Sequence, residues 1–389
     1  MSTVSFDNIK NAFAYKSNAD LQRAYMLFKA INNRSLVSLM EPATSFAMKI
    51  GLPINFAIKG TIFKQFVGGE TIEECNATIQ KLYENKVGSI LDYSVEGQET
   101  EEAFEQTTQA ILGTVKKATN NPAISFCVFK VTGFATHDIL AKQSAGMQLN
   151  PDEQQQWQRV QNRVDRICGT AAQNNVRIFI DAEESWIQQA IDDMANAMMQ
   201  KYNTQHPIVY NTIQFYRTDR LEFLKQSHQH AINHNYILGI KLVRGAYMEK
   251  ERKRAMDFEY TCPIQPNKES SDRDYDAGLK FCIEHINTIA ICAGTHNEQS
   301  SLLLTQLMEK NNIPHQHPHI WFSQLLGMSD HISFNLAVAG YNVCKYVPYG
   351  PVKSVMPYLF RRAKENTSMA GQMSRELSLI VNEIKRRKS

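Results

Sequence analysis

Eight short apolar runs, each followed by a helix-length polar segment, constrain the fold of this chain more than any other feature. The runs are rich in β-branched residues and nearly continuous in hydrophobicity, which is typical of parallel strands covered by helices. They recur at about the spacing of a βα unit. The runs are residues 88–95, 124–131, 176–183, 209–215, 237–245, 289–295, 320–326 and 343–349.

Eight βα units are the number that closes a parallel barrel, so we expect an α/β fold of the (β/α)8 TIM-barrel type. An open doubly wound sheet remains an alternative, because periodicity does not show closure. No GxGxxG sequence follows any run, which argues against the usual dinucleotide-binding form of that sheet. Helical spacing at residues 20–29 and 36–48, and a helix start at Thr71, predict an N-terminal helical region over residues 1–85 and a barrel domain over 86–389.

Composition excludes several classes of protein. The net charge is only +3 and no basic stripe is present, so we expect no nucleic-acid partner. Seven scattered cysteines without a CxxC pair indicate reduced thiols inside a cell. The first residues lack the apolar run of a secretory signal, and no stretch reaches the ~18 apolar residues of a membrane helix. We expect a bacterial cytoplasmic protein that contacts the inner membrane peripherally, with a mitochondrial matrix location left open.

Two segments fit the repeating pattern less well. Residues 249–278 are highly charged and include CPIQPNKESSD, which predicts a loop or lid after the fifth strand. Residues after Asn366 predict a final helix with a frayed tail.

Barrel enzymes carry their sites at the C-terminal ends of the strands. The polar and aromatic candidates at those ends are Asp92, Lys130, Asp181, Glu183, Gln214, Tyr216, Lys241, Arg244, Tyr247, Thr295, His296, Asn297, Gln324, Lys345, Tyr346 and Tyr349.

Lys130 is the clearest candidate, because a charge inside an apolar strand needs a partner or a ligand. A structural ion pair with Asp181 or Glu183 is an equally good interpretation. Lys241 and Arg244 are three residues apart, so they face opposite sides of a strand. We expect at most one of them to point into the barrel and the other to form a salt bridge with the helical shell.

A helix after the last strand carries Tyr358, Arg361, Arg362 and Glu365 on one face. Two arginines there suit bidentate binding of a carboxylate. An isolated arginine pair more commonly belongs to a solvated, charged helix face, and this interpretation stays open. The HxHxH sequence at residues 315–319 suggests a metal site, but it precedes the seventh strand and so lies at the non-catalytic end of the barrel.

Six motifs in order resemble the proline dehydrogenase family, and the resemblance covers roughly residues 64–380. They are FIDAEES (179–185), KLVRGAY (241–247), GTHN (294–297), FSQLLGMSD (322–330), KYVPYGPV (345–352) and YLFRRAKEN (358–366). The chain is closer to the monofunctional, mitochondrial-type members than to the bifunctional bacterial ones. No aldehyde dehydrogenase domain follows, so we expect another protein to catalyse the second step of proline catabolism.

The resemblance implies a distorted barrel whose last helix sits over the barrel mouth. It also implies FAD as cofactor, L-proline as substrate and Δ1-pyrroline-5-carboxylate as product, with hydride passing from C5 of proline to N5 of the flavin. A membrane quinone would reoxidise the flavin, which implies transient membrane contact. Oligomeric state is not predicted.

The resemblance further implies roles for individual residues. Arg361 and Arg362 would bind the proline carboxylate, with Lys130 reaching it from the barrel floor and Glu365 holding an arginine. Asp92 and Asp181 would orient the tyrosine and lysine groups. Tyr247, Tyr346 and Tyr358 would wall the substrate ring, with Leu242 as apolar packing in the substrate-binding site.

The predicted FAD contacts are Gln214, Lys241, Val243, Arg244, Gly245, Thr295, His296 and Asn297. Some members of the family carry Arg first and Lys fourth in the KLVRGAY motif, so it stays open whether Lys241 or Arg244 reaches the flavin.

Three alternative functions remain. One is the same chemistry on trans-4-hydroxyproline, although the bulk of Tyr346 should crowd a ring hydroxyl. Another is a metal-dependent barrel hydrolase that uses the histidine-rich segment. The third is a barrel that binds without catalysis, and retention of Lys130, Arg361 and Arg362 together argues against it.

Overall fold

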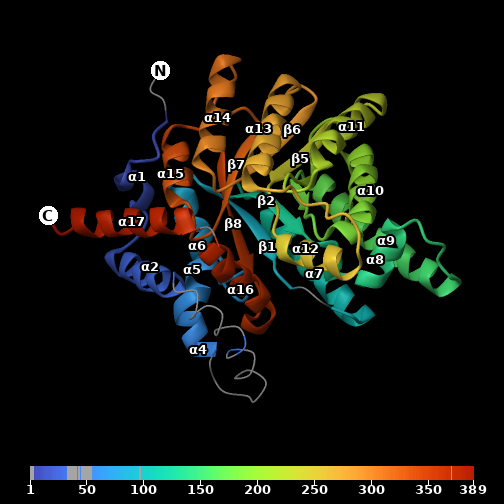
Figure 1. Ribbon diagram of the computed structural model, residues 1–389, viewed down its shortest axis with the longest axis horizontal. Coiled ribbons are helices and arrows are strands. Elements are labelled where there is room, and N and C mark those ends of the chain that lie inside the picture. The colour runs from blue at the N-terminus through green and yellow to red at the C-terminus, as the bar shows by residue number, and fades with distance from the viewer. Residues whose placement is uncertain (1–3, 33–41, 43, 45–54, 96–97, 369) are drawn as a thin grey trace.

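Eight parallel strands close into a barrel in chain order (Figure 1). The computed structural model describes residues 4–32, 42, 44, 55–95, 98–368 and 370–389, without the side chains of residues 55, 57 and 364–374. The strands are β1 (Gly88–Tyr93), β2 (Ile124–Phe129), β3 (Ile178–Ile180), β4 (Val209–Gln214), β5 (Leu238–Val243), β6 (Ile289–Gly294), β7 (Ile320–Leu325) and β8 (Val343–Tyr349). All eight predicted strands are confirmed, and the open-sheet alternative is wrong because β8 pairs with β1, Leu91 opposite Val347.

Helices follow the strands and surround the barrel. They are α7 (Glu101–Ala118), η2 (Val131–Gly133, a 3-10 turn), α8 (His137–Ser144), α9 (Pro151–Gln173), α10 (Ser185–Tyr202), α11 (Arg220–Asn233), α12 (Met248–Asp257), α13 (Lys268–Glu284), α14 (Glu298–Lys310), α15 (Asp330–Val338), α16 (Val352–Ser368) and α17 (Ala370–Arg386).

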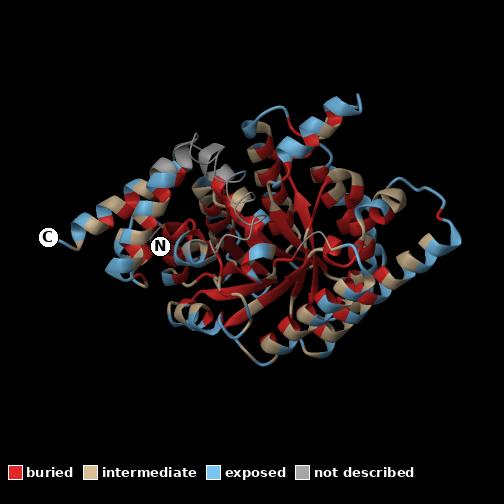
Figure 2. Ribbon diagram, turned by 90° about the horizontal axis from the view of Figure 1, so that it is seen from below, coloured by how far each residue is buried: buried red, intermediate tan, exposed pale blue. Residues whose placement is uncertain are grey.

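The barrel interior is packed with side chains. Phe126 and Phe179 stack with ring centroids 4.4 Å apart, and Tyr210 meets Phe126 edge-on at 5.4 Å. Residues of the opposite strand faces join the main core between sheet and helices, so the strands are buried on both sides (Figure 2). This explains their near-continuous hydrophobicity, and it places polar groups at the two ends of the barrel.

The N-terminal region is helical, as predicted. It contains α1 (Ile9–Phe13), α2 (Asn18–Ile31), α4 (Asn55–Ile58), the π-helical turn η1 (Lys59–Phe63), α5 (Lys64–Phe66) and α6 (Asn76–Glu84). The helix predicted at 20–29 is α2, which Ser17 and Asp20 start with a reciprocal capping box. The helix predicted at 36–48 lies largely outside the described residues. The helix predicted to open at Thr71 begins later, because the Thr71 hydroxyl accepts from the Glu74 N–H within a turn that precedes α6.

The two ends of the chain lie together. The α17 helix packs against α1 and α2 (Figure 1), which confirms the predicted final helix. The predicted frayed tail is wrong for Arg387, whose guanidinium donates to the carbonyls of Phe13 and Lys16, each at 2.8 Å. The boundary near residue 85 stays a prediction, and α6 packs directly on β1.

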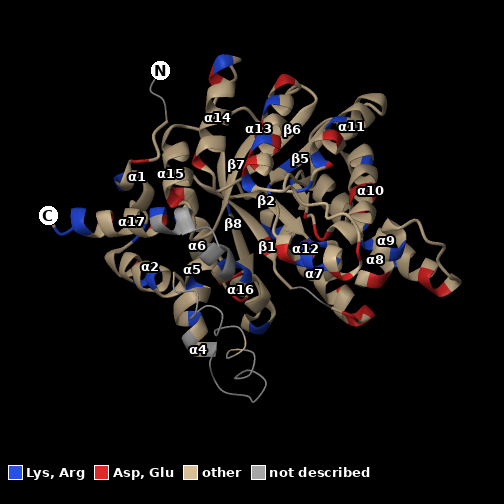
Figure 3. Ribbon diagram, in the orientation of Figure 1, with Lys and Arg blue, Asp and Glu red and all other residues tan. Residues whose placement is uncertain are grey.

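The predicted loop over residues 249–278 is mostly helical, contrary to expectation. It contains α12 and the first part of α13, with only residues 258–267 between them. The sequence of α12 is made of helix-favouring residues without Gly or Pro, and Asn267 caps α13 by accepting from the Ser270 N–H. Residues of both charge signs lie on the helices around the barrel in the view of Figure 3. No helix in the described ranges is both long enough and apolar enough to cross a bilayer.

Candidate active site

Asp181 is the centre of a polar cluster at the C-terminal end of β3. Its Oδ2 accepts a hydrogen bond of 2.5 Å from the Tyr346 hydroxyl, and its Oδ1 forms an ion pair with the Lys241 ammonium. Thr212 donates a further, longer bond of 3.4 Å. Side chains from β4, β5 and β8 thus converge on Asp181, which follows β3. Burial, followed by the charges of Asp181 and Asp92, raises the pKa of Tyr346 well above its usual range.

Lys241 and Arg244 face opposite sides of the β5 end, as the sequence predicts. The Lys241 ammonium lies 4.9 Å from the ring centroid of Phe179, inside the barrel. The Arg244 guanidinium pairs with Asp272 of α13 at 2.6 Å, which is the predicted salt bridge to the helical shell. It also donates to the Thr295 hydroxyl at 2.7 Å. Arg244 is therefore a fixed cation at the rim.

Lys130 follows β2 and lies near Glu183, which follows β3. Burial raises the pKa of Glu183 to about 7, while the charge of Lys130 and hydrogen bonds from Thr132 act against this shift. The Thr132 backbone N–H and hydroxyl reach the Glu183 carboxylate at 3.1 and 2.5 Å. Of the two predicted acidic neighbours, Glu183 interacts electrostatically with Lys130, and Asp181 pairs with Lys241 instead.

The α16 helix brings its cationic face to the mouth of the barrel. Arg362 is buried, and its guanidinium carbon lies 5.2 Å from the Tyr358 ring centroid. The Tyr358 hydroxyl contributes to the raised pKa of Tyr346 at the β8 end. Arg361 is half-buried on the same face. The predicted solvated helix is therefore wrong for this face. The side chain of Glu365 lies outside the description.

The β6 end adds Thr295, His296 and Asn297. The His296 Nδ1 lies 2.9 Å from the Ser329 hydroxyl. Burial, with the cations Lys345 and Arg362, lowers the pKa of His296 to about 3, so this imidazole is neutral. Asn297 caps α14 by accepting from two backbone N–H groups. These residues lie beside Arg244 and complete one side of the rim.

Leu242 does not lie where the sequence analysis expected it. Its side chain is fully buried in the core between sheet and helices, against Gly278 of α13 and beside Phe215. This placement disagrees with the predicted role of Leu242 as apolar packing in the substrate-binding site. The strand alternation already indicated it, because Leu242 neighbours the inward-facing Lys241.

A second buried ion cluster was missed by the sequence analysis. Asp330 begins α15 and pairs with Lys16 at 2.9 Å and Lys345 at 2.7 Å, while the Tyr15 hydroxyl donates at 2.7 Å. Burial lowers the pKa of Lys345, against the opposing charge of Asp330. Lys345 within an apolar strand was the signal, but its partners come from distant segments.

The three histidines of HxHxH do not share one site: His317 and His319 lie with ring centroids 5.4 Å apart, whereas His315 has other partners. His315 contacts the Ala339 carbonyl at 2.9 Å and stacks on Tyr341, while His319 contacts the Ile286 carbonyl at 3.1 Å. Among the described residues, no group of three or more His, Cys, Asp or Glu side chains has the arrangement of a metal site.

Comparisons with known proteins show the family of this chain. The family model described as proline dehydrogenase matches residues 75–375. The chain is 33% identical to proline dehydrogenase 1, mitochondrial, of Dictyostelium discoideum, with 96% of this chain and 74% of that one covered. It is 30% identical to hydroxyproline dehydrogenase of Xenopus laevis, covering 96% of this chain and 88% of the relative.

A similar solved structure is proline utilization A (PutA) from Bdellovibrio bacteriovorus inactivated by N-propargylglycine. Its TM-score is 0.72 at 20% identity, which shows a shared fold. The match covers 94% of this chain and 37% of the PutA chain. Together with the family model and the curated relatives, the strand-end motifs place this chain in the proline dehydrogenase family.

Proposed function

We propose that this protein is an FAD-dependent enzyme that oxidises L-proline to Δ1-pyrroline-5-carboxylate. The observation that carries the proposal is the convergence of Lys241 and Tyr346 on Asp181 at the barrel mouth, next to the arginines of α16. Such a site combines fixed cations for a carboxylate with an aromatic surface for a small ring.

Arg361, Arg362 and Lys130 would hold the substrate carboxylate. An arginine guanidinium matches a carboxylate in two parallel hydrogen bonds, which fixes orientation as well as position. Burial of Arg362 strengthens this interaction because water competes less. Glu365 stays a predicted partner of this arginine pair.

Tyr247, Tyr346 and Tyr358 would surround the pyrrolidine ring. All three are buried, with 7%, 9% and 7% of their surface exposed, so they exclude water from the ring. Asp181 acts as a positioning residue, because it fixes the Tyr346 hydroxyl and the Lys241 ammonium together. Asp92 lies near enough to contribute to the raised pKa of Tyr346.

The polar groups of the rim fit a flavin. The Gln214 side-chain oxygen is buried, and it accepts no hydrogen bond among the described residues, as expected of an amide that pairs with a bound polar ring. Gly245 has φ +140°, and a Cβ there would stand 2.4 Å from the Tyr216 ring, so a bulkier residue would close the rim. We propose that these two residues hold FAD with Lys241, Val243, Arg244, Thr295, His296 and Asn297.

The reaction removes one hydride from C5 of proline and one proton from its nitrogen, leaving a C=N bond in the ring. FAD supplies the two-electron acceptor for the hydride. The protein holds the carboxylate and the ring faces, so that the C5 hydrogen is presented in one orientation. Neutral His296 and the anchored Arg244 set the charge on the cofactor side.

The electron acceptor and the location are part of the proposal. The family resemblance supports a quinone as acceptor and hence peripheral contact with a membrane. Curated relatives include mitochondrial enzymes and a bacterial protein, CarD of Pectobacterium carotovorum. We propose the bacterial cytoplasm near the inner membrane, with a mitochondrial matrix as the alternative.

The first test is the absorbance spectrum of the FAD-loaded protein in the absence of oxygen. Adding L-proline should bleach the flavin band, because hydride moves to the cofactor. The Arg362→Met variant should need about 10- to 100-fold more proline for half-reduction, the loss expected for one charge-assisted carboxylate contact. The matched control is Lys353→Met, an exposed position on α16, which should behave as wild type.

The same absorbance test with trans-4-hydroxyproline distinguishes the two candidate substrates. The 30% identity to a hydroxyproline dehydrogenase makes trans-4-hydroxyproline the second candidate. Bleaching by that compound alone would keep the chemistry and overturn the steric argument from Tyr346. A protein that takes up FAD but is reduced by neither compound would contradict the proposal.

A further inference from the structure

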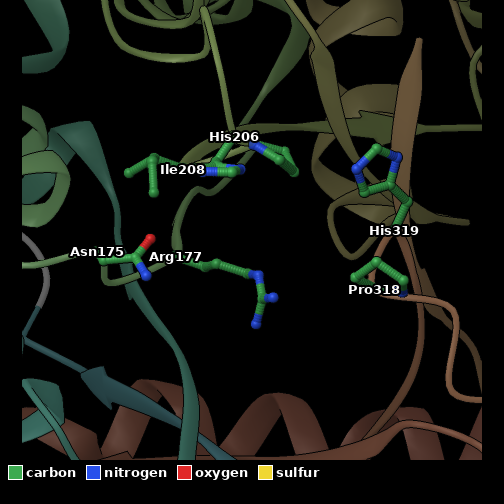
Figure 4. A pocket seen from close by; sticks show the side chains of 7 residues that line it. Asn175, Arg177, His206, Ile208, Pro318 and His319 are labelled. Carbon is green, nitrogen blue, oxygen red and sulfur yellow. The ribbon is translucent and has the colours of Figure 1, made fainter. Parts of the chain in front are cut away.

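A cavity of about 320 Å³ lies at the opposite end of the barrel from the candidate active site (Figure 4). The segments that lead into β3, β4 and β7 surround it. The residues that line it are Asn175, Arg177, His206, Pro207, Ile208, Pro318 and His319. Its lining therefore carries one permanent cation, two imidazoles and no acidic side chain.

Two aromatic rings lie beside the Arg177 guanidinium. Its guanidinium carbon lies 5.7 Å from the Phe126 ring centroid and 5.4 Å from that of Trp321. Figure 4 shows the guanidinium extending into the open space between Asn175, His206 and Pro318. Both distances are within the range of a cation–π interaction, so the two rings favour this position of the guanidinium before any ligand arrives.

The charge of Arg177 is not neutralised by the protein. Within the described ranges Arg177 forms no ion pair, although most other arginines of the barrel helices do. Its polar neighbour is the buried Tyr210 hydroxyl, whose pKa burial raises and Arg177 lowers. A guanidinium has five N–H donors, so the contact with Tyr210 leaves Arg177 further donors for a ligand in the cavity that it lines.

Further polar side chains surround the cavity. His206 and Asn175 are exposed at the cavity edge. The His319 Nδ1 donates to the Ile286 carbonyl at 3.1 Å, which fixes the ring and leaves Nε2 of the neutral imidazole as an acceptor, so His319 shapes the cavity and does not donate to an anion. The HxHxH sequence thus contributes one residue to this cavity and forms no metal cluster among the described residues.

We propose that the N-terminal end of the barrel binds a small molecule through a carboxylate or phosphate group, with Arg177 as the principal ligand. A planar guanidinium that has no ion-pair partner in the described part of the chain is suited to bidentate binding of an oxyanion. The cavity volume is at the lower end of the range for small-molecule sites, which fits a compact anion. A purely structural role, in which Arg177 only closes the barrel floor by stacking, predicts no anion binding.

Isothermal titration of the FAD-loaded full chain with inorganic phosphate, and separately with succinate, tests the proposal at constant ionic strength. Saturable binding of at least one anion is expected. The Arg177→Gln variant should weaken it at least about tenfold, the loss expected when a charge-assisted bidentate contact is removed. Preference for phosphate or for succinate distinguishes the two kinds of oxyanion.

Two further variants keep the test decisive if Arg177→Gln folds poorly. His206→Gln changes an exposed residue at the cavity edge and should weaken binding several-fold. The matched control, His137→Gln, changes an exposed histidine at the start of α8 and should leave binding unchanged. Absence of binding to wild type, or equal binding to the wild-type, His206→Gln and His137→Gln proteins, would overturn the proposal.

Discussion

Asp181 accepts interactions from three side chains at the barrel mouth, those of Tyr346, Lys241 and Thr212. Its two oxygens accept from Tyr346 and pair with Lys241, and all three groups are mostly withdrawn from water. A buried ion pair contributes modestly to stability when intact, because desolvation offsets much of the attraction. Removing one partner is costly, because the other charge stays buried alone.

The Asp181→Asn variant should therefore lower both stability and activity. The free energy of unfolding should fall by about 3 kcal/mol, because Lys241 loses its counter-charge. Proline-dependent flavin reduction should slow at least about tenfold, since Lys241 and Tyr346 are no longer held together. Urea denaturation and stopped-flow absorbance measure the two effects.

Asp193→Asn is the matched control for this substitution. Asp193 is an exposed residue of α10, and its side chain accepts a hydrogen bond from Gln189. The free energy of unfolding of Asp193→Asn should therefore differ from that of the wild type by less than about 0.5 kcal/mol. An Asp181→Asn protein as stable as this control would mean that the buried ion pair does not form.

At the scale of elements, α17 fastens the N-terminal helices to the barrel. Glu383 is completely buried and pairs with both Arg386 and Arg387. Only Arg387 of this pair also reaches the N-terminal segment, through the carbonyls of Phe13 and Lys16. A comparison of Arg386 with Arg387 therefore distinguishes a contact within α17 from a link between α17 and the N-terminal segment.

Arg387→Ala should lower the free energy of unfolding by about 1 to 2 kcal/mol, because two backbone carbonyls lose a charged donor. It should also increase hydrogen exchange in α1 and α2. Arg386→Ala is the control, since its contact is a half-exposed pair within the helix, and its effect should be below about 0.5 kcal/mol. Equal effects of the two variants would show that the link to the N-terminal segment is not stabilising.

At the scale of the whole molecule, buried carboxylates set the dependence of stability on pH. Burial alone would raise the pKa of Asp330, but Lys16 and Lys345 hold it well below its usual range. A hydrogen bond from His331 and contacts with Arg375 lower the pKa of Glu298 to about 2, against the effect of burial. Groups with lowered pKa stabilise the fold above their unfolded pKa of about 4.

The free energy of unfolding should therefore decrease as the pH falls from about 5 to 2. Asp330→Asn should be less stable at pH 7 by about 3 kcal/mol and should show a shallower decrease in acid. Glu183, whose pKa is raised to about 7, acts in the opposite sense and removes stability as the pH rises from about 4.5 to 7. Denaturation curves at several pH values measure both slopes.

Asp152→Asn, at an exposed position in the first turn of α9, is the control for Asp330→Asn. Its pH profile should match that of the wild type. If the free energy of unfolding of the Asp330→Asn protein fell in acid with the same slope as that of the wild type, other carboxylates would control acid unfolding.

The sequence by itself determined the architecture and much of the candidate site. Parallel strands buried on both faces need continuous apolar runs, and the runs recur at βα spacing, so all eight strands were predicted near their observed bounds. The opposite directions of Lys241 and Arg244 followed from strand alternation alone. Local helix content was underestimated in residues 249–278, where charge was taken as a sign of a loop.

Only the tertiary structure decided how distant segments combine. Closure of the barrel depends on β1 meeting β8, about 250 residues apart, which no local pattern encodes. The pairing of Asp181 with Lys241, and of Asp330 with Lys16 and Lys345, depends on which side chains closure brings within hydrogen-bond distance. Sequence periodicity reports which face a residue occupies, whereas the partner of a buried charge is fixed by packing across the whole molecule.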